Sequence, residues 1–230
     1  MITIRRGNER GHARHGWLDS HHTFSFADYY DEKFMGFSDL RVINDDWVVG
    51  GAGFGTHPHR DMEIISYVLE GSIEHKDSMG MHERLKAGEV QVMSAGTGVR
   101  HSEYNGSATD KLNFLQIWIM PNQRGGEPRY AQKDFSGATG ITLVVSPDGR
   151  NGSLPIRQDA AIHRIKLVQE SAEFLTAPAR VYYLQVARGV LMVNGTLLSA
   201  GDGAFIKDEA NLQFSTEQQA EALLMDLRAD

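Results

Sequence analysis

The sequence predicts an all-β protein that consists of two β-barrel domains. The chain has 230 residues and 24 glycines, and the glycines separate short apolar runs that are rich in β-branched and aromatic residues. Runs of this kind, bounded by turn-forming residues, are typical of strands. Helical periodicity is scarce, and many short strands joined by turns favour a sandwich or a barrel. A faint repeat between the two halves indicates that the barrel is duplicated.

The strand pattern recurs along the whole chain, whereas the segment 159–173, with a weak helical periodicity, is the best candidate for a short helix. The dipeptide Asn194-Gly195 ends one predicted strand, and Asn-Gly favours the tight turn of a β-hairpin. The predicted strands are 62–69, 89–93, 112–120, 141–145, 181–186, 190–193 and 204–206.

A polar stretch at 122–129 separates the two halves of the chain. It contains two glycines and a proline, and it follows a predicted strand that ends near Met120. Because this composition is typical of a connecting segment, we expect a linker over about 122–140. The expected domains are residues 1–130, which carry the functional site, and residues 131–230.

The two halves share an order of strand, glycine, hairpin and second strand. In the first half, 67–71 ends in glycine and is followed by 85–93, where Ala-Gly-Glu precedes the new strand. In the second half, 184–189 ends in glycine and is followed by 198–206, where Ala-Gly-Asp precedes the new strand. Two matches in the same order indicate a duplicated barrel.

Composition excludes several classes of function. The 23 basic and 30 acidic residues give a net charge of −7, which argues against binding to nucleic acid or to an anionic membrane surface. The absence of cysteine excludes disulfides, a thiolate nucleophile and zinc fingers, so any metal must be held by histidine and carboxylate. No apolar stretch resembles a signal peptide or a membrane span, and we therefore expect a cytoplasmic protein.

Two short segments contain the residue types that bind transition metals. His57 and His59 are two positions apart, as are His101 and Glu103, so each pair shares one face of a strand. If the two strands are neighbours, three nitrogens and one oxygen converge on a point. This donor set suits Fe(II), Mn, Co, Ni, Cu or Zn, and it can leave positions open for substrate or O2.

These histidines and the aromatic residues near the N-terminus also have interpretations that involve no metal or ligand. An isolated His-x-His is more often a surface or hydrogen-bonded pair, and it is the combination of both motifs that favours a metal site. The aromatic segment 17–37 could line a pocket for a planar ligand, although core packing is the simpler interpretation. We expect surface or hydrogen-bonding roles for His12, His15, His21 and His22, and we expect His75 and His82, on either side of a turn, to be solvated.

The two segments resemble the two motifs of the cupin superfamily. Gly51, His57, His59 and Glu63 fit the first motif, and Gly88, Gly96, His101 and Asn105 fit the second. Ser94 replaces the proline of the second motif, and the spacing before His101 is longer. These departures look like the pirin branch of the cupins, as do segments 17–26, 40–46, 75–80 and 94–98. The C-terminal half is similar to bacterial pirin-like quercetin 2,3-dioxygenases.

The resemblance implies a bicupin fold with one metal site. The implied ligands are His57, His59, His101 and Glu103, whereas in many other cupins the carboxylate would be Glu63. The repeat places Leu175 and Ala177 where the second half would need histidines, so the C-terminal domain is expected to lack a metal.

The resemblance also implies a metal-dependent dioxygenase that cleaves a flavonol-like aromatic with O2 and releases carbon monoxide. The implied metal is Fe(II), with Zn, Cu, Ni, Co or Mn as alternatives, and Glu103 is the implied proton acceptor. We expect a monomer. The alternatives are a metal-dependent regulatory or redox-sensing binding protein, and a different metal enzyme such as an isomerase on the same scaffold.

Overall fold

The computed structural model describes residues 1–229, and these residues form strands almost throughout. They divide into two compact units. The N-terminal unit comprises Gly11–Gly137 and Leu154–Gln158, and the C-terminal unit comprises Met1–Arg10, Ala138–Ser153 and residues 159–229. The prediction of an all-β chain is confirmed. Within the described residues, no helix has the length and apolar character needed to cross a membrane.

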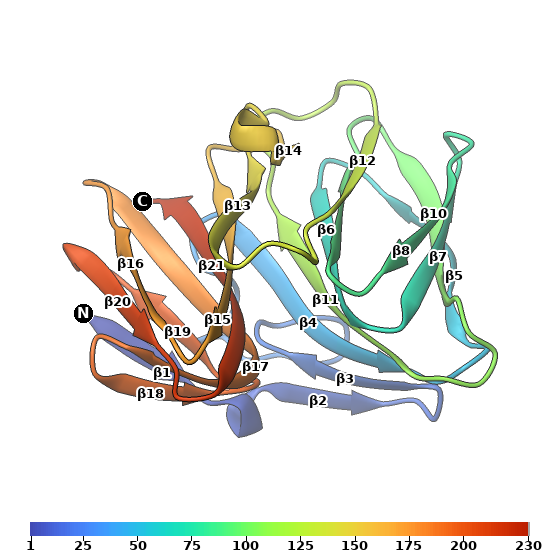
Figure 1. Ribbon diagram of the computed structural model, residues 1–230. Coiled ribbons are helices and arrows are strands. Elements are labelled where there is room, and N and C mark those ends of the chain that lie inside the picture. The colour runs from blue at the N-terminus through green and yellow to red at the C-terminus, as the bar shows by residue number, and fades with distance from the viewer. Residues whose placement is uncertain (230) are drawn as a thin grey trace. The chain divides into compact units, whose positions relative to one another are not determined.

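The N-terminal unit contains two sheets (Figure 1). The strands of these sheets are β2 (Gly11–Arg14), β3 (Leu18–His22), β4 (Leu40–Val48), β5 (Gly53–His59), β6 (Glu63–Glu70), β7 (Ser72–Asp77), β8 (His82–Lys86), β9 (Glu89–Ser94), β10 (Val99–Asn105), β11 (Leu112–Ile119) and β12 (Arg129–Asp134). The short strand β14 (Leu154–Pro155) also lies in this unit and belongs to neither of the two sheets. One sheet has seven strands in the order β12-β9-β6-β11-β4-β3-β2, and the other has four in the order β5-β10-β7-β8.

The core of the N-terminal unit draws on both sheets. In β7, Ile73 and His75 are buried and the residues between and beside them are more exposed, as the two-residue period of a strand requires. Strand β6 is buried almost throughout because β9 and β11 flank it. Each large apolar side chain buried here contributes roughly 1.5–3 kcal/mol. One core cluster comprises Leu18, Val48, Val68, Ile73, Leu85, Leu112 and Phe114.

The C-terminal unit is built around one long strand. Its strands are β1 (Ile2–Arg5), β13 (Gly140–Ser146), β15 (Ala161–Val168), β16 (Ser171–Leu175), β17 (Arg180–Val193), β18 (Thr196–Ser199), β19 (Gly203–Ile206), β20 (Asn211–Ser215) and β21 (Gln219–Arg228), with 3-10 turns η1 (Gly7–Glu9) and η2 (Arg150–Gly152). Strand β17 pairs with β19 and β21 along its first half and with β18 and β20 along its second.

All seven predicted strands lie on observed strands, but the helix predicted at 159–173 is wrong. That segment forms β15 and β16, joined by a turn at Gln169, where φ is +50°. Ile162 and Ile165 have a helix-like spacing of three, yet β15 pairs with β13 along one edge and with β21 along the other, and most of its residues are buried. The hairpin at Asn194-Gly195 is confirmed, since both residues have positive φ and join β17 to β18.

The observed units differ from the expected domains at two places. Met1–Arg10 belongs to the C-terminal unit because β1 pairs with β19. Leu154–Gln158 belongs to the N-terminal unit, where Gln158 Nε2 donates to the Met120 carbonyl at 2.7 Å. The expected linker also contains β12, an edge strand that pairs with β9 and is polar because much of it is exposed.

The glycines of the repeat have equivalent conformations. Gly71 and Gly189 have φ of +76° and +71°, and Gly88 and Gly201 have φ of +87° and +90°. A Cβ atom at Gly71 would lie 2.7 Å from the Lys111 carbonyl oxygen. At Gly189 a Cβ atom would meet the backbone carbonyl of the adjacent β21. Both halves therefore have glycine at these two positions because a side chain would be strained by the positive φ and would collide with a neighbouring backbone.

Replacing Gly189 by alanine is expected to destabilise the protein by roughly 2–4 kcal/mol, from left-handed strain and a backbone clash. Gly195→Ala is the matched control, because Gly195 has a φ of +78° and no atom within 4 Å of the added Cβ. The control should lose only about 1–2 kcal/mol. Urea unfolding at constant pH measures both, and equal losses would contradict the clash.

Candidate metal centre

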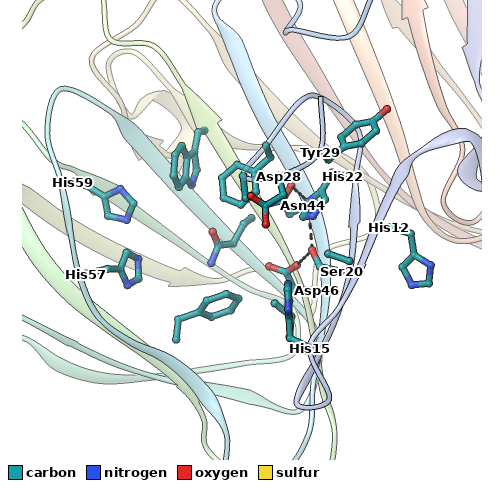
Figure 2. Close-up of a pocket in the computed structure, with 17 residues that line it drawn as sticks. His12, His15, Ser20, His22, Asp28, Tyr29, Asn44, Asp46, His57 and His59 are labelled. Carbon is teal, nitrogen blue, oxygen red and sulfur yellow. Dashed lines mark hydrogen bonds between the residues drawn. The ribbon is translucent and has the colours of Figure 1, made fainter. Parts of the chain in front are cut away.

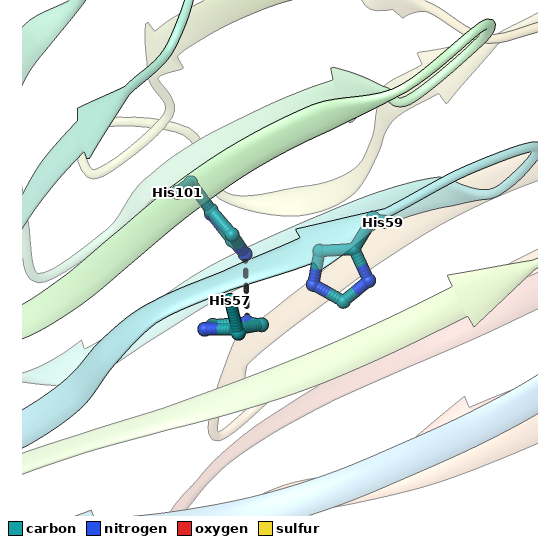
Figure 3. A group of neighbouring side chains, drawn as sticks. All are labelled: His57, His59 and His101. Atoms are coloured by element: carbon teal, nitrogen blue, oxygen red, sulfur yellow. Dashed lines mark hydrogen bonds between the residues drawn. The ribbon is translucent and has the colours of Figure 1, made fainter.

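Three histidines of the N-terminal unit lie side by side on two paired strands. His57 on β5 and His101 on β10 are direct cross-strand partners, and His59 is two residues further along β5 on the same face. The ring centres are 4.5 Å apart for His57 and His101, and 4.9 Å apart for His59 and His101 (Figure 3). The structure therefore brings together the three histidines that the sequence singled out.

The nitrogen atoms of these rings fit a shared metal ion. His57 donates its Nδ1 proton to the Gly55 carbonyl at 2.8 Å, which leaves the Nε2 lone pair free to bind a metal. That Nε2 lies 3.0 Å from Nε2 of His101. Two nitrogens bound at about 2.1 Å and at a right angle around one ion would be about 3.0 Å apart. Ligand-capable atoms of His57, His59 and His101 all lie within 4.8 Å of one another.

The surroundings keep two of these imidazoles, His59 and His101, uncharged near neutral pH. Burial, followed by the neighbouring histidines, lowers the pKa of His59 to about 4 and that of His101 to about 3. Neutral imidazole is the form that binds metals, so these two side chains need not lose a proton to do so.

Glu103 supplies a buried carboxylate next to His101. Its side chain is 2% exposed, Oε1 accepts a hydrogen bond from Ser66 Oγ at 3.1 Å, and Oε2 accepts one from Gln116 Nε2 at 2.8 Å. Burial raises the pKa of Glu103, which gives the carboxylate a greater affinity for a proton. A carboxylate oxygen of Glu103 and ring nitrogens of His101 and His75 all lie within 4.8 Å of one another. His57 and His59 are not in this group.

Glu63, the alternative carboxylate, occupies a different environment. Its Oε2 accepts a hydrogen bond from Ser94 Oγ at 2.6 Å, and Arg157 hydrogen-bonds to it through the backbone. Within residues 1–229, Glu63 is in none of the groups of ligand-capable side chains.

His75 is a site residue that the sequence interpretation missed. We expected it to be solvated, yet it is fully buried, and its Nε2 lies 2.9 Å from Oδ2 of the buried side chain of Asp77. His75 is the cross-strand partner of Glu103 on β10. The period of two in β7 could have revealed it, since His75 follows the buried Ile73. His82, by contrast, is exposed as expected.

A cavity of about 620 Å³ opens beside His57 and His59, which contribute to its wall (Figure 2). Gln116 also lines it. The indole of Trp118 meets the His59 ring edge-on with ring centres 5.0 Å apart. Phe26, Phe54 and Tyr29 also line the cavity, so part of the aromatic segment at 17–37 faces a pocket.

The four histidines His12, His15, His21 and His22 differ in their surroundings, and His15 is an exposed residue at the wall of the cavity. His12, His21 and Asp19 form a solvent-accessible group in which His12 Nε2 lies 2.8 Å from Asp19 Oδ1, and the two rings stack with centres 4.2 Å apart. Parallel stacked rings do not direct their nitrogens at one point, and Arg14 also hydrogen-bonds to Asp19. His22 is buried and lines the cavity.

Asp46, which also lines the cavity, has an unusual proton affinity. Burial, aided by the nearby carboxylates of Asp45 and Glu103, raises its pKa to about 7, although Ser20 Oγ donates a hydrogen bond to it. The folded protein thus keeps this proton up to about pH 7, whereas the unfolded chain releases it near 3.8. The resulting stabilisation is complete below pH 3.8 and is lost as the pH rises to about 7.

We therefore expect Asp46→Asn to gain stability relative to the parent protein between pH 4 and pH 8, by an upper limit of roughly 4 kcal/mol. The free energy of unfolding of both metal-free proteins, measured in urea across this range, tests the expectation. Parallel pH profiles for the two proteins would contradict it.

Comparison with known proteins identifies the family. Residues 4–119 match the family model described as Pirin, and residues 143–227 match the model of the quercetinase C-terminal cupin domain. The chain belongs to the pirin family. The bicupin fold is therefore confirmed, because a pirin domain is recognised in the N-terminal half and a cupin domain in the C-terminal half.

Close relatives of the chain are known in Escherichia coli. The protein named quercetin 2,3-dioxygenase from strain K12 is 55% identical over 229 residues, which cover 99% of each chain. The crystal structure of the bacterial pirin YhhW in complex with nickel(II) has a TM-score of 0.96 and 53% identity, and the match covers 100% of both chains. A second YhhW structure has a TM-score of 0.97, with 54% identity over 100% of this chain and 99% of that one. The nickel complex and the three converging histidines together support a divalent metal in this family member.

Proposed function

We propose that this protein is a metal-dependent dioxygenase of the quercetin 2,3-dioxygenase type. In this reaction a flavonol takes up both atoms of O2, its heterocyclic ring opens, and one ring carbon leaves as carbon monoxide. The observation that carries the proposal is the convergence of three histidines, two of which line the wall of a cavity that is rich in aromatic side chains. The relative named quercetin 2,3-dioxygenase supports the choice of substrate class.

The proposed ligands are His57, His59, His101 and Glu103, and the proposed metal is Fe(II). Imidazole and carboxylate together suit Fe(II) as well as Ni, Co, Cu, Mn or Zn. When bound, such a metal supplies Lewis acidity that favours ionisation of an enol hydroxyl, and it leaves coordination positions open. The hydrogen bond from His57 to the Gly55 carbonyl orients one of these imidazoles in advance.

Glu103 is the group that accepts the proton of the flavonol 3-hydroxyl. Its raised pKa makes it a stronger base than an exposed carboxylate, and burial keeps water from competing for the proton. Ser66 and Gln116 hold its two oxygens in fixed positions. Because Gln116 also lines the cavity, it links the carboxylate to the place where substrate would lie.

The aromatic wall of the cavity holds the planar substrate. Trp118 contacts both His59 and Phe26, with ring centres 5.0 and 5.4 Å apart, so the indole is held between a histidine and a second aromatic ring. Aromatic surfaces of this kind bind flat ring systems and exclude water from the reacting atoms.

The C-terminal unit is proposed to be structural and free of metal. Leu175 and Ala177 stand where the repeat would require histidines, and His163 packs its ring edge-on against Phe174 with centres 4.9 Å apart. The groups of ligand-capable side chains found in residues 1–229 all lie in the N-terminal unit.

The decisive experiment is aerobic turnover of quercetin with detection of carbon monoxide. Fe(II)-loaded protein should consume quercetin and O2 in equal amounts and release carbon monoxide, whereas metal-stripped protein should do none of these. A loaded protein that binds metal tightly but leaves quercetin intact would contradict the proposal and favour the regulatory alternative. Substrate-dependent O2 uptake separates an oxygenase from an isomerase.

A further inference from the structure

A row of four polar side chains lines the cavity on strands β3 and β4. Ser20 pairs across the strands with Asp46, and His22 pairs with Asn44, so all four share one face of the seven-stranded sheet. Each residue is at most 5% exposed, and all four line the cavity that His57 and His59 also line (Figure 2). We call these four residues the polar row.

Hydrogen bonds connect the members of the polar row. Ser20 Oγ donates to Asp46 Oδ1, and His22 donates its Nδ1 proton to Asn44 Oδ1 at 2.8 Å. His22 Nδ1 also lies 3.5 Å from Ser20 Oγ. These bonds fix the rotamers and leave the second oxygen of Asp46 and the amide nitrogen of Asn44 to meet other partners. The Asp46 oxygen can accept a hydrogen bond, or donate one while the carboxyl group is protonated, and the Asn44 nitrogen donates.

The polar row favours an occupant that can hydrogen-bond to it. A ligand that displaced water from the row without forming such bonds would leave these polar atoms unpaired, at a cost of roughly 1–3 kcal/mol per atom. Leu18, Phe26 and Phe54 form part of the remaining wall and offer no such bonds to a ligand's polar edge. A flat ligand with hydroxyl groups on its rim would hydrogen-bond to the polar row and pack its ring faces against the apolar side chains.

We propose that the polar row binds hydroxyl groups on the part of the substrate remote from the reacting enol. The row would thus select flavonols with additional hydroxyl groups over flavonol itself, which has only the 3-hydroxyl. The proposal rests on the proposed function and deepens it. Figure 2 shows the row and the pair His57 and His59 on separate parts of the cavity wall, which places a recognition surface away from the metal centre.

The charge of the row favours a neutral, hydroxylated occupant. Asp46 keeps its proton to about pH 7, so near neutrality its carboxyl group can either accept a hydrogen bond from a phenol or donate one to it. Asp45 and Glu103 add negative potential near Asp46. A carboxylate or phosphate ligand would therefore be repelled, whereas a phenol would not.

Ligand binding without turnover tests the proposal directly. Dissociation constants are measured without O2, by calorimetry and by tryptophan fluorescence, on metal-free and metal-loaded protein. The two probes are quercetin and flavonol itself, whose only hydroxyl group is the 3-hydroxyl. A site built to bind a hydroxyl rejects an analogue that lacks it, so we expect the parent protein to prefer quercetin by roughly 5- to 100-fold.

The double variant Ser20→Ala/Asp46→Leu removes both members of one pair and leaves no unpaired partner, which keeps the cost to folding small. It should bind the two flavonols within about threefold of each other, mainly because quercetin binding weakens. Asp45→Leu is the matched control, since Asp45 is the next residue on β4 and does not line the cavity. It should keep the preference of the parent protein.

The outcomes separate this inference from the proposed function. The inference is overturned if the parent protein binds the two flavonols equally or binds neither. It is also overturned if the double variant keeps the preference for quercetin. Selective binding that is lost in the double variant supports it even if the loaded protein does not turn over quercetin, a result that would count against the proposed function alone.

Discussion

Replacement of His101 by alanine is expected to abolish metal binding and flavonol turnover together. His101 is 1% exposed, its Nε2 lies 3.0 Å from that of His57, and it belongs to both groups of ligand-capable side chains at the centre. Loss of a residue that merely orients a ligand costs roughly 10- to 100-fold in metal affinity, so loss of a ligand should cost more than about 100-fold. Turnover should then fall to the level of metal-stripped protein.

Anaerobic titration with Fe(II) against a competing chelator measures the affinity, and O2 uptake with quercetin measures the activity. His82→Ala is the matched control, because His82 is an exposed histidine of β8 that hydrogen-bonds to Glu74. The control should keep both properties. If His101→Ala binds Fe(II) within about threefold of the parent protein, the proposed ligand set is wrong.

The parts of the site that could be predicted from the sequence depend on local geometry. Whether His57 and His59 share a face follows from the period of a strand, and the same holds for His101 and Glu103. The cupin motifs add that the two strands are neighbours, which the observed pairing of His57 with His101 confirms. The alternation of side chains along a strand and a family motif therefore suffice to predict that His57, His59 and His101 lie close together.

The parts that could not be predicted depend on pairing between strands that are distant in sequence. The pairing of β1 with β19 joins residues about 200 positions apart, as in Ile2 with Ile206, and nothing in composition signals it. His75 becomes part of the site only because β7 lies next to β10. The polar row likewise requires β3 and β4 to pair, since Ser20 and Asp46 look like ordinary surface residues when read alone.

The helix predicted at 159–173 shows how neighbours override local pattern. An apolar spacing of three fits a helix face, but β13 and β21 offer hydrogen-bonding partners on both sides of β15. A central strand buried on both sides can have apolar residues at successive positions, so it loses the alternation by which strands are recognised.

Replacement of Glu103 by glutamine is expected to lower turnover by roughly 10²- to 10⁴-fold, the contribution typical of a positioned proton acceptor. Glutamine has nearly the same shape. Its carbonyl oxygen can accept from Gln116, and its amide can donate to the hydroxyl of Ser66, which can turn to accept. The packing therefore survives, whereas the negative charge and the capacity to take up a proton do not.

Glu63→Gln is the matched control for this change, since Glu63 is equally buried, has a pKa raised by burial and accepts a hydrogen bond from a serine. Glu103→Gln should also weaken Fe(II) binding, because a neutral amide is a poorer ligand than a carboxylate. Turnover is therefore compared at saturating Fe(II), where a remaining deficit reports proton transfer and a restored rate reports metal binding alone. If Glu63→Gln loses its metal as completely as His101→Ala, the carboxylate ligand is Glu63, and the role proposed here for Glu103 fails.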